Sequence, residues 1–446
     1  MDYLPNTNVK VVEGIRLHST VPNEAKQKQS PSATNPRPIN IVFNGRNDNG
    51  TPDNFVLTEK LLSQHLMLIG GIGSGKTNTF NQILQNIVPQ LSSRDVMIIF
   101  DTKGDFYKEF YTPGDIVISN DATARGSFGV DYWNVINELE DDESLEENCI
   151  EIANALFLDK LSEGGDSFFP NAAKDIFGAV IYHFAKNKLH IKADNKELSG
   201  CLKSVNCEWF NALLNKYPQF KAMKSYIPND APGQAVGVLA EMQQVVRQMF
   251  VGNFAKPGTL SIRDLVRKKG GKKIFIEYDI GIGGMLTPIY SLLFDLAIKE
   301  ALCRSKSDGN VFFVVDEFKL LPNLHHIDDA VNFGRSLGIK FMIGIQNVDQ
   351  IIKAYDEHMA KNIFSGFLNQ FAFKVSDHST REYIKERAGK NRKLTTFKTV
   401  GVHESLEGAN VVEDWDVSRL KLGHAIVMLN NSEPFVFGFP EFIGKR

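Results

Sequence analysis

A glycine-rich loop between an apolar run and a helical pattern is the feature that most constrains this chain. The stretch HLMLIGGIGSGKTNTFNQILQNIVPQL, residues 65–91, begins with apolar residues typical of a buried strand. It then carries Gly-x-x-x-x-Gly-Lys-Thr at residues 70–77 and continues with apolar residues at helical spacing. A second apolar run, VMIIFD, follows at residues 96–101. This strand–helix–strand unit predicts a parallel sheet within an α/β fold.

The glycine loop itself predicts a nucleotide site that takes ATP and Mg²⁺. Glycines let consecutive backbone N–H groups point at phosphate oxygens, and the next helix directs its positive end at them. We expect Lys76 to reach the β- and γ-phosphates and the Thr77 hydroxyl to ligate magnesium. The alternative is a chance match in a glycine-rich turn, which the flanking strand and helix disfavour. The predicted nucleotide-binding residues are Gly70, Gly71, Gly73, Ser74, Gly75, Lys76, Thr77 and Asn78.

Two strands end in aspartate, and each aspartate is a candidate for the magnesium site. In VFFVVDE, residues 311–317, Asp316 is followed directly by Glu317. Adjacent acids can divide the work, with Asp316 at the metal and Glu317 orienting the water that attacks the γ-phosphate. In VMIIFDTKGDFY, residues 96–107, no acid directly follows Asp101. Asp101 is the weaker candidate: we expect it near the magnesium or its waters, or else as the cap of a surface turn.

Composition excludes several classes of protein. The chain has 446 residues, and its 43% of apolar residues suffice for a sizeable core. The 50 basic and 53 acidic residues exclude a uniformly basic nucleic-acid coat but not a local basic channel. Four cysteines without a Cys-x-x-Cys pair fit a reducing cytosol, and no stretch approaches the ~18 apolar residues that span a bilayer. We therefore expect a cytoplasmic protein, held at the inner face of the cell membrane only through a partner.

Four segments of the chain differ in their patterns. Residues 1–38 are polar and proline-bearing and are expected to form a flexible arm. Strand signals mark residues 39–137, helical periodicity dominates residues 138–262, and strand signals return over residues 263–446. We interpret the second and fourth segments as two parts of one nucleotide-binding domain, which the third segment interrupts as an all-helical domain.

The motifs, taken together, resemble the coupling-protein ATPases of conjugation and type IV secretion, within the FtsK–HerA group of ring translocases. The similar pieces occur in the family's order over residues 40–440, with the P-loop first and FDTKGDFY second. FFPNAAKDIFGAVIYHF resembles the family's aromatic-and-alanine helix, VVDEFKLLPNL its Walker B segment, and AVNFGRSLGIKFMIGIQNVDQI its Arg-then-Gln segment. The resemblance implies a RecA-like P-loop NTPase fold with a mostly parallel sheet and an inserted all-helical domain.

The same resemblance implies two further catalytic residues beside Glu317. Gln346 closes a buried apolar strand and would sense the γ-phosphate. Arg335 falls where the family carries an arginine finger, which is given to the site of the neighbouring subunit. For Arg335 the alternative is a solvated helix charge, and Arg381 and Arg387 are second choices for the finger.

A function and a set of partners also follow from the resemblance. It implies an ATP-hydrolysing, hexameric ring motor that recruits and translocates DNA, or a protein–DNA complex, in conjugation or type IV secretion. The partners would be DNA without sequence preference, a relaxase or another secreted protein, and membrane channel components; a monomer in the absence of DNA stays open. Two other functions stay open as well: a soluble HerA-like DNA translocase in repair or phage defence, and an ATP-gated docking platform for protein substrates.

Many members of this family start with two transmembrane helices that the present sequence does not show. A separate membrane subunit, a naturally soluble variant or a trimmed chain would each account for the difference.

Two basic clusters are candidates for contact with the DNA backbone, at residues 267–273 and 389–398. The first directly precedes a strand, so we interpret it as a solvated turn. The second combines Lys390, Arg392 and Lys393 with threonines and one aromatic residue in an expected loop. For this second cluster a DNA contact and a solvated turn both stay open.

Overall fold

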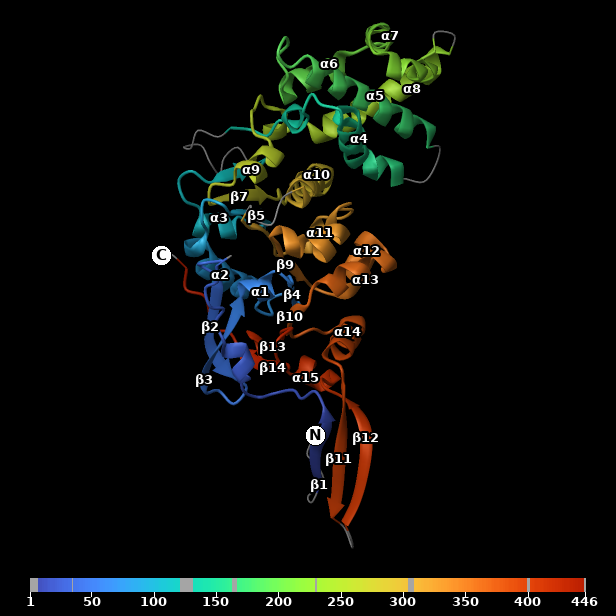
Figure 1. Ribbon diagram of the computed structural model, residues 1–446. Helices are drawn as coiled ribbons and strands as arrows, with labels where there is room; N and C mark the ends of the chain where they lie inside the picture. Colours follow the sequence, from blue (N-terminus) through green and yellow to red (C-terminus); the bar gives the residue numbers. More distant parts are fainter. Residues whose placement is uncertain are drawn as a thin grey trace.

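The chain folds into three tiers, and the computed structural model describes residues 7–33, 35–120, 131–162, 167–228, 231–303, 309–398 and 402–444. A helical tier, a large central sheet with its helices, and a slender three-stranded sheet follow one another along the molecule (Figure 1). The first strand belongs to the slender sheet, whereas the C-terminal end lies beside the central sheet. The nucleotide loop and both strand-end acids belong to the central tier.

The central sheet is mostly parallel, as the sequence predicts. Among the described residues its strands follow the order β3-β2-β14-β13-β10-β4-β9-β8-β5-β7-β6. Neighbours from β10 to β6 pair in parallel, and neighbours from β10 to β3 pair antiparallel. The bounds are Asn40–Asn47 (β2), Pro52–Thr58 (β3), Leu66–Ile69 (β4), Val96–Asp101 (β5), Ile116–Ile118 (β6), Lys272–Glu277 (β7), Val311–Val315 (β8), Ile339–Ile345 (β9), Asn369–Phe373 (β10), His424–Met428 (β13) and Phe435–Gly438 (β14).

Helices cover both faces of this sheet, which explains the continuous apolar runs of its parallel strands. In β5, Met97 and Ile99 pack into one core, whereas Ile98 and Phe100 pack into the other, because successive side chains of a strand point to opposite faces. The first core includes helices α1 (Glu59–Leu62), α2 (Lys76–Ile87) and α3 (Asp105–Phe110). The second core includes α10 (Gly283–Leu302), α11 (Ile327–Phe333), α12 (Val348–Tyr355), α13 (Glu357–Gly366) and α14 (His378–Ala388).

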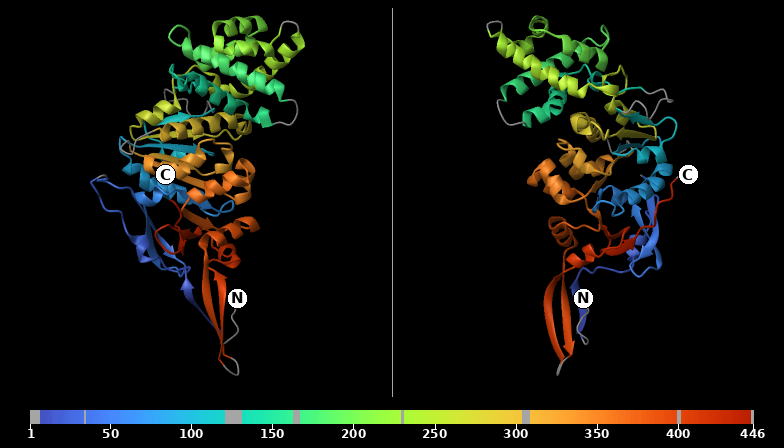
Figure 2. Two further views of the ribbon diagram at one scale, coloured as in Figure 1. Left: turned by 45° about the vertical axis from the view of Figure 1, so that its right-hand side comes forward. Right: turned by 180° about the vertical axis from the view of Figure 1, so that it is seen from behind.

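The helical tier stands at one end of the central sheet in every view (Figure 2). Its helices are α4 (Leu145–Ser162), α5 (Phe168–Lys186), α6 (Asn195–Ser204), α7 (Cys207–Lys216) and α8 (Pro232–Met249), and α9 (Ile262–Lys268) leads back to the sheet. The Glu138 carboxylate accepts hydrogen bonds from the Ile262 N–H at 2.7 Å and the Ser261 hydroxyl at 2.9 Å. The two ends of the tier therefore lie side by side. That residues 138–262 form a separate domain is still a prediction.

The slender sheet differs from two expectations. Strand β1 (Thr7–Gly14), within the expected flexible arm, pairs antiparallel with β11 (Lys390–Lys398), within the expected loop. Strand β11 also pairs with β12 (Val402–Asn410), so backbone partners flank it on both sides. Pairing between segments so distant in the chain leaves no local sequence signal, because strand propensity depends strongly on context.

Two smaller features concern the chain's end and its helices. Strands β13 and β14, which follow one another in the chain, pair antiparallel. Across the ranges that the structure describes, none of the helices combines the length and the apolar character needed to cross a membrane.

Candidate active site

The P-loop connects the end of β4 to the start of α2, and its glycines are required by its shape. Gly73 and Gly75 have φ of 70° and 118°, a region that other residues rarely adopt. A Cβ atom on Gly70 would lie 2.5 Å from the Ser74 hydroxyl oxygen. The Gly70 N–H donates to the Ile345 carbonyl at 3.1 Å, and the Gly71 N–H donates to the Lys374 carbonyl at 3.0 Å. The loop is thus fixed to the strand ends on both sides of β4.

Lys76 and Ser74 give this loop side-chain donors whose hydrogen bonds phosphate oxygens would accept. The Lys76 side chain is 8% exposed, and its ammonium donates to the carbonyls of Gly70 at 2.5 Å and Gly71 at 3.1 Å. Burial lowers the pKa of Lys76. The Ser74 hydroxyl is buried and has no hydrogen-bond partner among the described residues. A buried ammonium and a buried hydroxyl beside a glycine loop fit phosphate oxygens well.

Thr77 and Asp316 form the second part of the site. Thr77 lies in the first turn of α2, and Asp316 directly follows β8. The Thr77 hydroxyl donates a hydrogen bond to the Asp316 carboxylate at 2.5 Å. Burial raises the pKa of Asp316. A hydroxyl and a carboxylate next to a phosphate loop are oxygen ligands of the kind that Mg²⁺ takes. The donor set therefore fits the magnesium ion that the sequence predicts here.

Glu317 and Gln346 meet beside this pair, because β8 and β9 are adjacent and parallel. The Gln346 side-chain amide donates to one Glu317 carboxylate oxygen at 2.9 Å. The other oxygen of Glu317 lies 3.3 Å from the Lys319 ammonium. Two of the three predicted catalytic residues thus touch each other, and Lys319 is a further neighbour for which no sequence motif gave a signal.

Asp101 holds the turn that follows β5. Its carboxylate oxygens accept the N–H groups of Tyr107 at 2.8 Å and Lys103 at 3.3 Å, and Gly104 has a φ of 71°. This geometry matches the capping alternative. Burial raises the pKa of Asp316, and the positive charge of Lys103 in this turn opposes that rise.

Asn78 faces the C-terminal segment of the chain. Its side-chain amide donates to the Pro440 carbonyl at 2.9 Å and accepts the Phe442 N–H at 2.7 Å. Gln82, one turn later in α2, also donates to the Pro440 carbonyl, at 2.6 Å. Residues 440–442 thus lie along the start of the P-loop helix. The sequence gives no local signal for this contact, since its partners stand at positions 78 and 440 of the chain.

Arg335 lies apart from these residues, at the opposite end of β9. It belongs to the short helix η8 (Gly334–Leu337), which precedes β9, whereas Gln346 directly follows β9. Seven strand residues separate the two ends by roughly 20 Å. Arg335 is exposed, and its side chain makes no hydrogen bond or ion pair with another described residue; Phe333 beside it is 67% exposed. By contrast, Arg381 and Arg387 donate hydrogen bonds to carbonyls of their own chain.

The three basic candidates for DNA contact lie on the slender sheet. Arg392 forms an ion pair with Glu13 at 3.2 Å, and the Lys393 ammonium donates to the Asn410 carbonyl at 3.4 Å. Lys390 is exposed. In the other cluster, Arg267 lies in the last turn of α9 and is paired with Glu300 and two further acids, and Lys273 is buried in β7 beside Asp115. The solvated-turn interpretation of residues 267–273 therefore fits only the middle of the cluster.

A glycine loop, a strand-end Asp-Glu pair and a polar residue closing the next parallel strand define a RecA-like P-loop NTPase. Residues 55–441 match the family of the type IV secretion-system coupling protein DNA-binding domain. Because this match covers most of the chain, the chain belongs to that family.

Two relatives support the family at the level of sequence. The coupling protein TraD of Escherichia coli (strain K12) is 25% identical over 369 residues, which cover 80% of this chain and 48% of TraD. The type IV secretion system-coupling protein VirD4 of Bartonella quintana (strain Toulouse) is 22% identical over 296 residues, which cover 61% of this chain and 44% of VirD4. The chain therefore spans about half the length of each relative.

Solved structures of similar fold include the plasmid coupling protein TrwB. Its trigonal form with sulphate has a TM-score of 0.73 and 17% identity, and the match covers 98% of this chain and 96% of that chain. Its complex with the ATP analogue ADPNP has a TM-score of 0.72 and 17% identity, covering 98% and 95%. Its complex with ADP and Mg²⁺ has a TM-score of 0.69 and 18% identity, covering 89% and 88%. At these identities the likeness establishes the RecA-like P-loop fold.

Proposed function

We propose that this chain is an ATP-hydrolysing motor that moves DNA, or DNA with an attached protein, in conjugation or type IV secretion. The observation that carries the proposal is the meeting of Thr77 with Asp316 and of Gln346 with Glu317 beside the P-loop. Membership of the coupling-protein family supports DNA as the cargo. The complexes of TrwB with an ATP analogue and with ADP and Mg²⁺ support ATP and magnesium as its cofactors.

Each residue of the site has a role in this proposal. The loop N–H groups, Ser74 and Lys76 bind the phosphates, and Lys76 exchanges its loop carbonyls for phosphate oxygens. Thr77 and Asp316 hold the magnesium ion, whose charge offsets that of the phosphates when it is bound. Glu317 orients the attacking water and accepts its proton, while Gln346 fixes one Glu317 oxygen and senses the γ-phosphate. Asp101 acts indirectly, by shaping the turn that carries Lys103.

Arg335 is proposed to serve the site of a neighbouring copy. The length of β9 separates Arg335 from Gln346, so its guanidinium is far from its own P-loop. An exposed arginine close to the exposed Phe333 suits a contact between subunits. This supports a ring of identical subunits, for which the sequence resemblance suggests six, and an arginine that stabilises transition-state charge in trans.

The remaining partners follow from the family. The helical tier would receive a relaxase or another secreted protein, and Lys390, Arg392 and Lys393 would contact the DNA backbone. Components of the membrane channel would hold the ring at the cytoplasmic face of the membrane.

The experiment that tests this function is ATP turnover with and without DNA. We expect the wild-type chain to hydrolyse ATP faster when DNA of arbitrary sequence is added, and Lys76→Ala to be inactive in both conditions. Bound secretion substrate with no DNA stimulation would favour the docking platform instead. No ATP turnover in any condition would contradict the proposal.

A further inference from the structure

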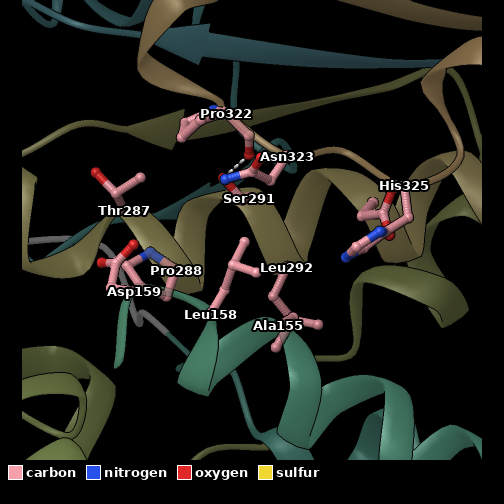
Figure 3. Close-up of a pocket in the computed structure, with 11 residues that line it drawn as sticks. Ala155, Leu158, Asp159, Thr287, Pro288, Ser291, Leu292, Pro322, Asn323 and His325 are labelled. Atoms are coloured by element: carbon pink, nitrogen blue, oxygen red, sulfur yellow. Dashed lines mark hydrogen bonds between the residues drawn. The ribbon is translucent and has the colours of Figure 1, made fainter. Parts of the chain in front are cut away.

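The helical tier meets the nucleotide-binding domain at a joint that is only partly filled. A cleft opens between α4, α10 and residues 322–325 (Figure 3). Ala155 and Leu158 of α4 face Pro288 and Leu292 of α10 across it. Close packing resists relative motion of two elements, so a cleft at this position leaves α4 room to shift against α10.

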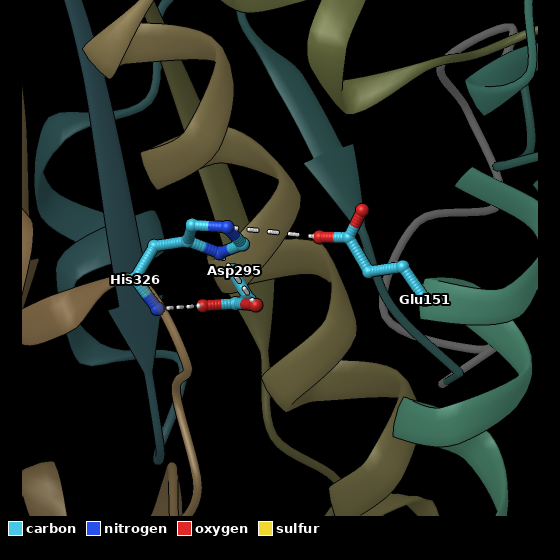
Figure 4. Close-up of side chains that lie close together, drawn as sticks. All are labelled: Glu151, Asp295 and His326. Carbon is cyan, nitrogen blue, oxygen red and sulfur yellow. Dashed lines mark hydrogen bonds and ion pairs between the residues drawn. The ribbon is translucent and has the colours of Figure 1, made fainter. Parts of the chain in front are cut away.

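A polar cluster adjoins this cleft and joins three separate elements (Figure 4). His326, directly before α11, donates its backbone N–H to Asp295 of α10 at 2.9 Å. Its Nδ1 lies 3.0 Å from the other carboxylate oxygen of Asp295. Its Nε2 lies 3.9 Å from Oε1 of Glu151 on α4, and this oxygen is buried without a hydrogen-bond partner among the described residues. The imidazole thus stands between a carboxylate of each domain.

The charges of the cluster balance when the imidazole is protonated. The charged groups that face His326 are Asp295 and Lys299 of α10 and Glu151 of α4. Lys299 forms an ion pair with Glu151 and donates to Asn148 at 3.2 Å. One lysine and one imidazolium offset two carboxylates, whereas a neutral imidazole leaves one negative charge in excess. The hydrogen bond with Asp295 accordingly raises the pKa of His326, although burial opposes it.

A short, firmly held segment connects this cluster to the active site. His326 follows Glu317 by nine positions in the chain. Between them, Phe318 stacks on Tyr355 of α12 with ring centroids 5.5 Å apart, and the Tyr355 hydroxyl donates to the Leu321 carbonyl. The Ser291 hydroxyl of α10 donates to the Pro322 carbonyl at 2.9 Å. A displacement of the strand end at Glu317 would therefore reach His326 through packed contacts rather than be absorbed by a loose loop.

We propose that His326, in its protonated form, positions the helical tier on the nucleotide-binding domain and passes a shift of the Asp316–Glu317 strand end to α4. The proposal rests on the ATPase activity proposed above. His326 is a positioning residue, since it touches no reacting atom. The two acids and the imidazole also resemble a transition-metal site, but both Asp295 oxygens are engaged by His326, and Lys299 holds Glu151.

The test compares His326→Gln with His325→Gln, a matched change in the neighbouring histidine, which is exposed and lines the cleft but makes none of the contacts of the cluster. The first measurement is the Tm of each protein without nucleotide across a pH series. A raised folded pKa means that the contribution of His326 to stability is present at low pH and is lost as pH rises through that pKa. We expect His326→Gln to lack the part of the pH dependence of Tm that His326 contributes, and His325→Gln to show the same pH dependence as the wild type. Glu151→Gln should reduce it and serves as a second variant if His326→Gln does not fold.

The second measurement is ATP turnover with and without DNA, together with hydrogen exchange over residues 145–161. In His326→Gln we expect basal turnover within about twofold of the wild type, faster exchange in α4, and DNA stimulation reduced roughly fivefold or more. Equal pH profiles of Tm for wild type and His326→Gln would overturn the proposal, as would unchanged DNA stimulation. A Tm rise with Zn²⁺ in the wild type but not in His326→Gln would assign a metal site instead. If the wild type has no ATP turnover, the proposed function fails, while the pH series and hydrogen exchange still decide on the joint.

Discussion

Glu317 is the side chain whose surroundings best suit activation of water. It follows the Asp316 that contacts Thr77, and Gln346 fixes one of its oxygens. We expect Glu317→Gln to lower kcat for ATP by about 10²–10⁴-fold, the usual contribution of a general base. Binding of ATP should stay within a few-fold, because Lys76 and the loop are unchanged. Steady-state turnover and calorimetric titration with ATP measure the two quantities.

The matched control for this prediction is Asp105→Asn, which neutralises an exposed acid at the start of α3. Its turnover should equal that of the wild type. Normal hydrolysis by Glu317→Gln would mean that another group activates the water.

Asp316 is predicted to cost stability in the absence of ligand. Burial raises its folded pKa, so the folded state holds the proton more tightly than the unfolded state does. Stability from this group is therefore present at low pH and falls as pH rises from the unfolded pKa to the folded one. At neutral pH we expect Asp316→Asn to raise the free energy of unfolding by roughly 0.5–2 kcal/mol. The same variant should lose the extra stabilisation that MgATP gives the wild type.

Thermal denaturation with and without MgATP measures both effects. Asp101→Asn is the useful contrast, since that carboxylate also has a pKa raised by burial but accepts two backbone N–H groups. It should lower the Tm, because an amide keeps only one accepting oxygen. A lower Tm for ligand-free Asp316→Asn would contradict the predicted stability cost of the buried Asp316 carboxylate.

At the scale of elements, the sequence predicted those helices, strands and loops whose formation depends on residues close together in the chain. The P-loop, its helix and the buried parallel strands each carry their signal within a few residues, and the structure has them where expected. Glu317 and Gln346 were assigned separately and meet because β8 and β9 pair in parallel. Contacts between distant segments had no such signal. Strand β1 pairs with β11, and Asn78 bonds to Pro440, across most of the length of the chain.

Strand β11 exposes Lys390 and Arg392, and its role in DNA contact is a prediction at this scale. If Lys390, Arg392 and Lys393 contact phosphates, replacing all three with glutamine leaves up to three phosphates without a neutralising partner. Fewer counterions are then released from the DNA on binding. The slope of log affinity against log salt should then fall by about 0.7–0.9 for each phosphate that is no longer neutralised. DNA binding of this triple variant over a salt series measures the slope.

The control is Lys268→Gln, which removes an exposed basic residue paired with Asp264 in the other basic cluster. It should leave the slope unchanged. An unchanged slope for the triple variant would mean that these three residues do not neutralise DNA phosphates. Arg392 would then serve only its ion pair with Glu13 within the slender sheet.

At the scale of the whole molecule, the roles proposed for Gln346 and Arg335 would make β9 a link between two active sites. Gln346, directly after β9, contacts Glu317 of its own chain, whereas Arg335, before the start of β9, is exposed at the opposite end of the strand. Because β9 is buried along its whole length, a change at Gln346 would be expected to displace the short helix that carries Arg335. In the proposed ring, hydrolysis in one subunit would then alter the site of the next through β9.

This arrangement predicts complementation between two inactive variants. Arg335→Ala retains an intact P-loop, and Lys76→Ala retains Arg335. In a mixed ring, a complete site forms wherever a Lys76→Ala subunit gives its Arg335 to the P-loop of a neighbouring Arg335→Ala subunit. We expect each variant alone to be nearly inactive and their mixture to hydrolyse ATP well above the sum of the two. A mixture of Lys76→Ala with Glu317→Gln is the matched control: both defects lie in the subunit's own site, so no complete site forms. Full activity of Arg335→Ala alone, or a mixture no better than the sum, would show that each chain completes its own site.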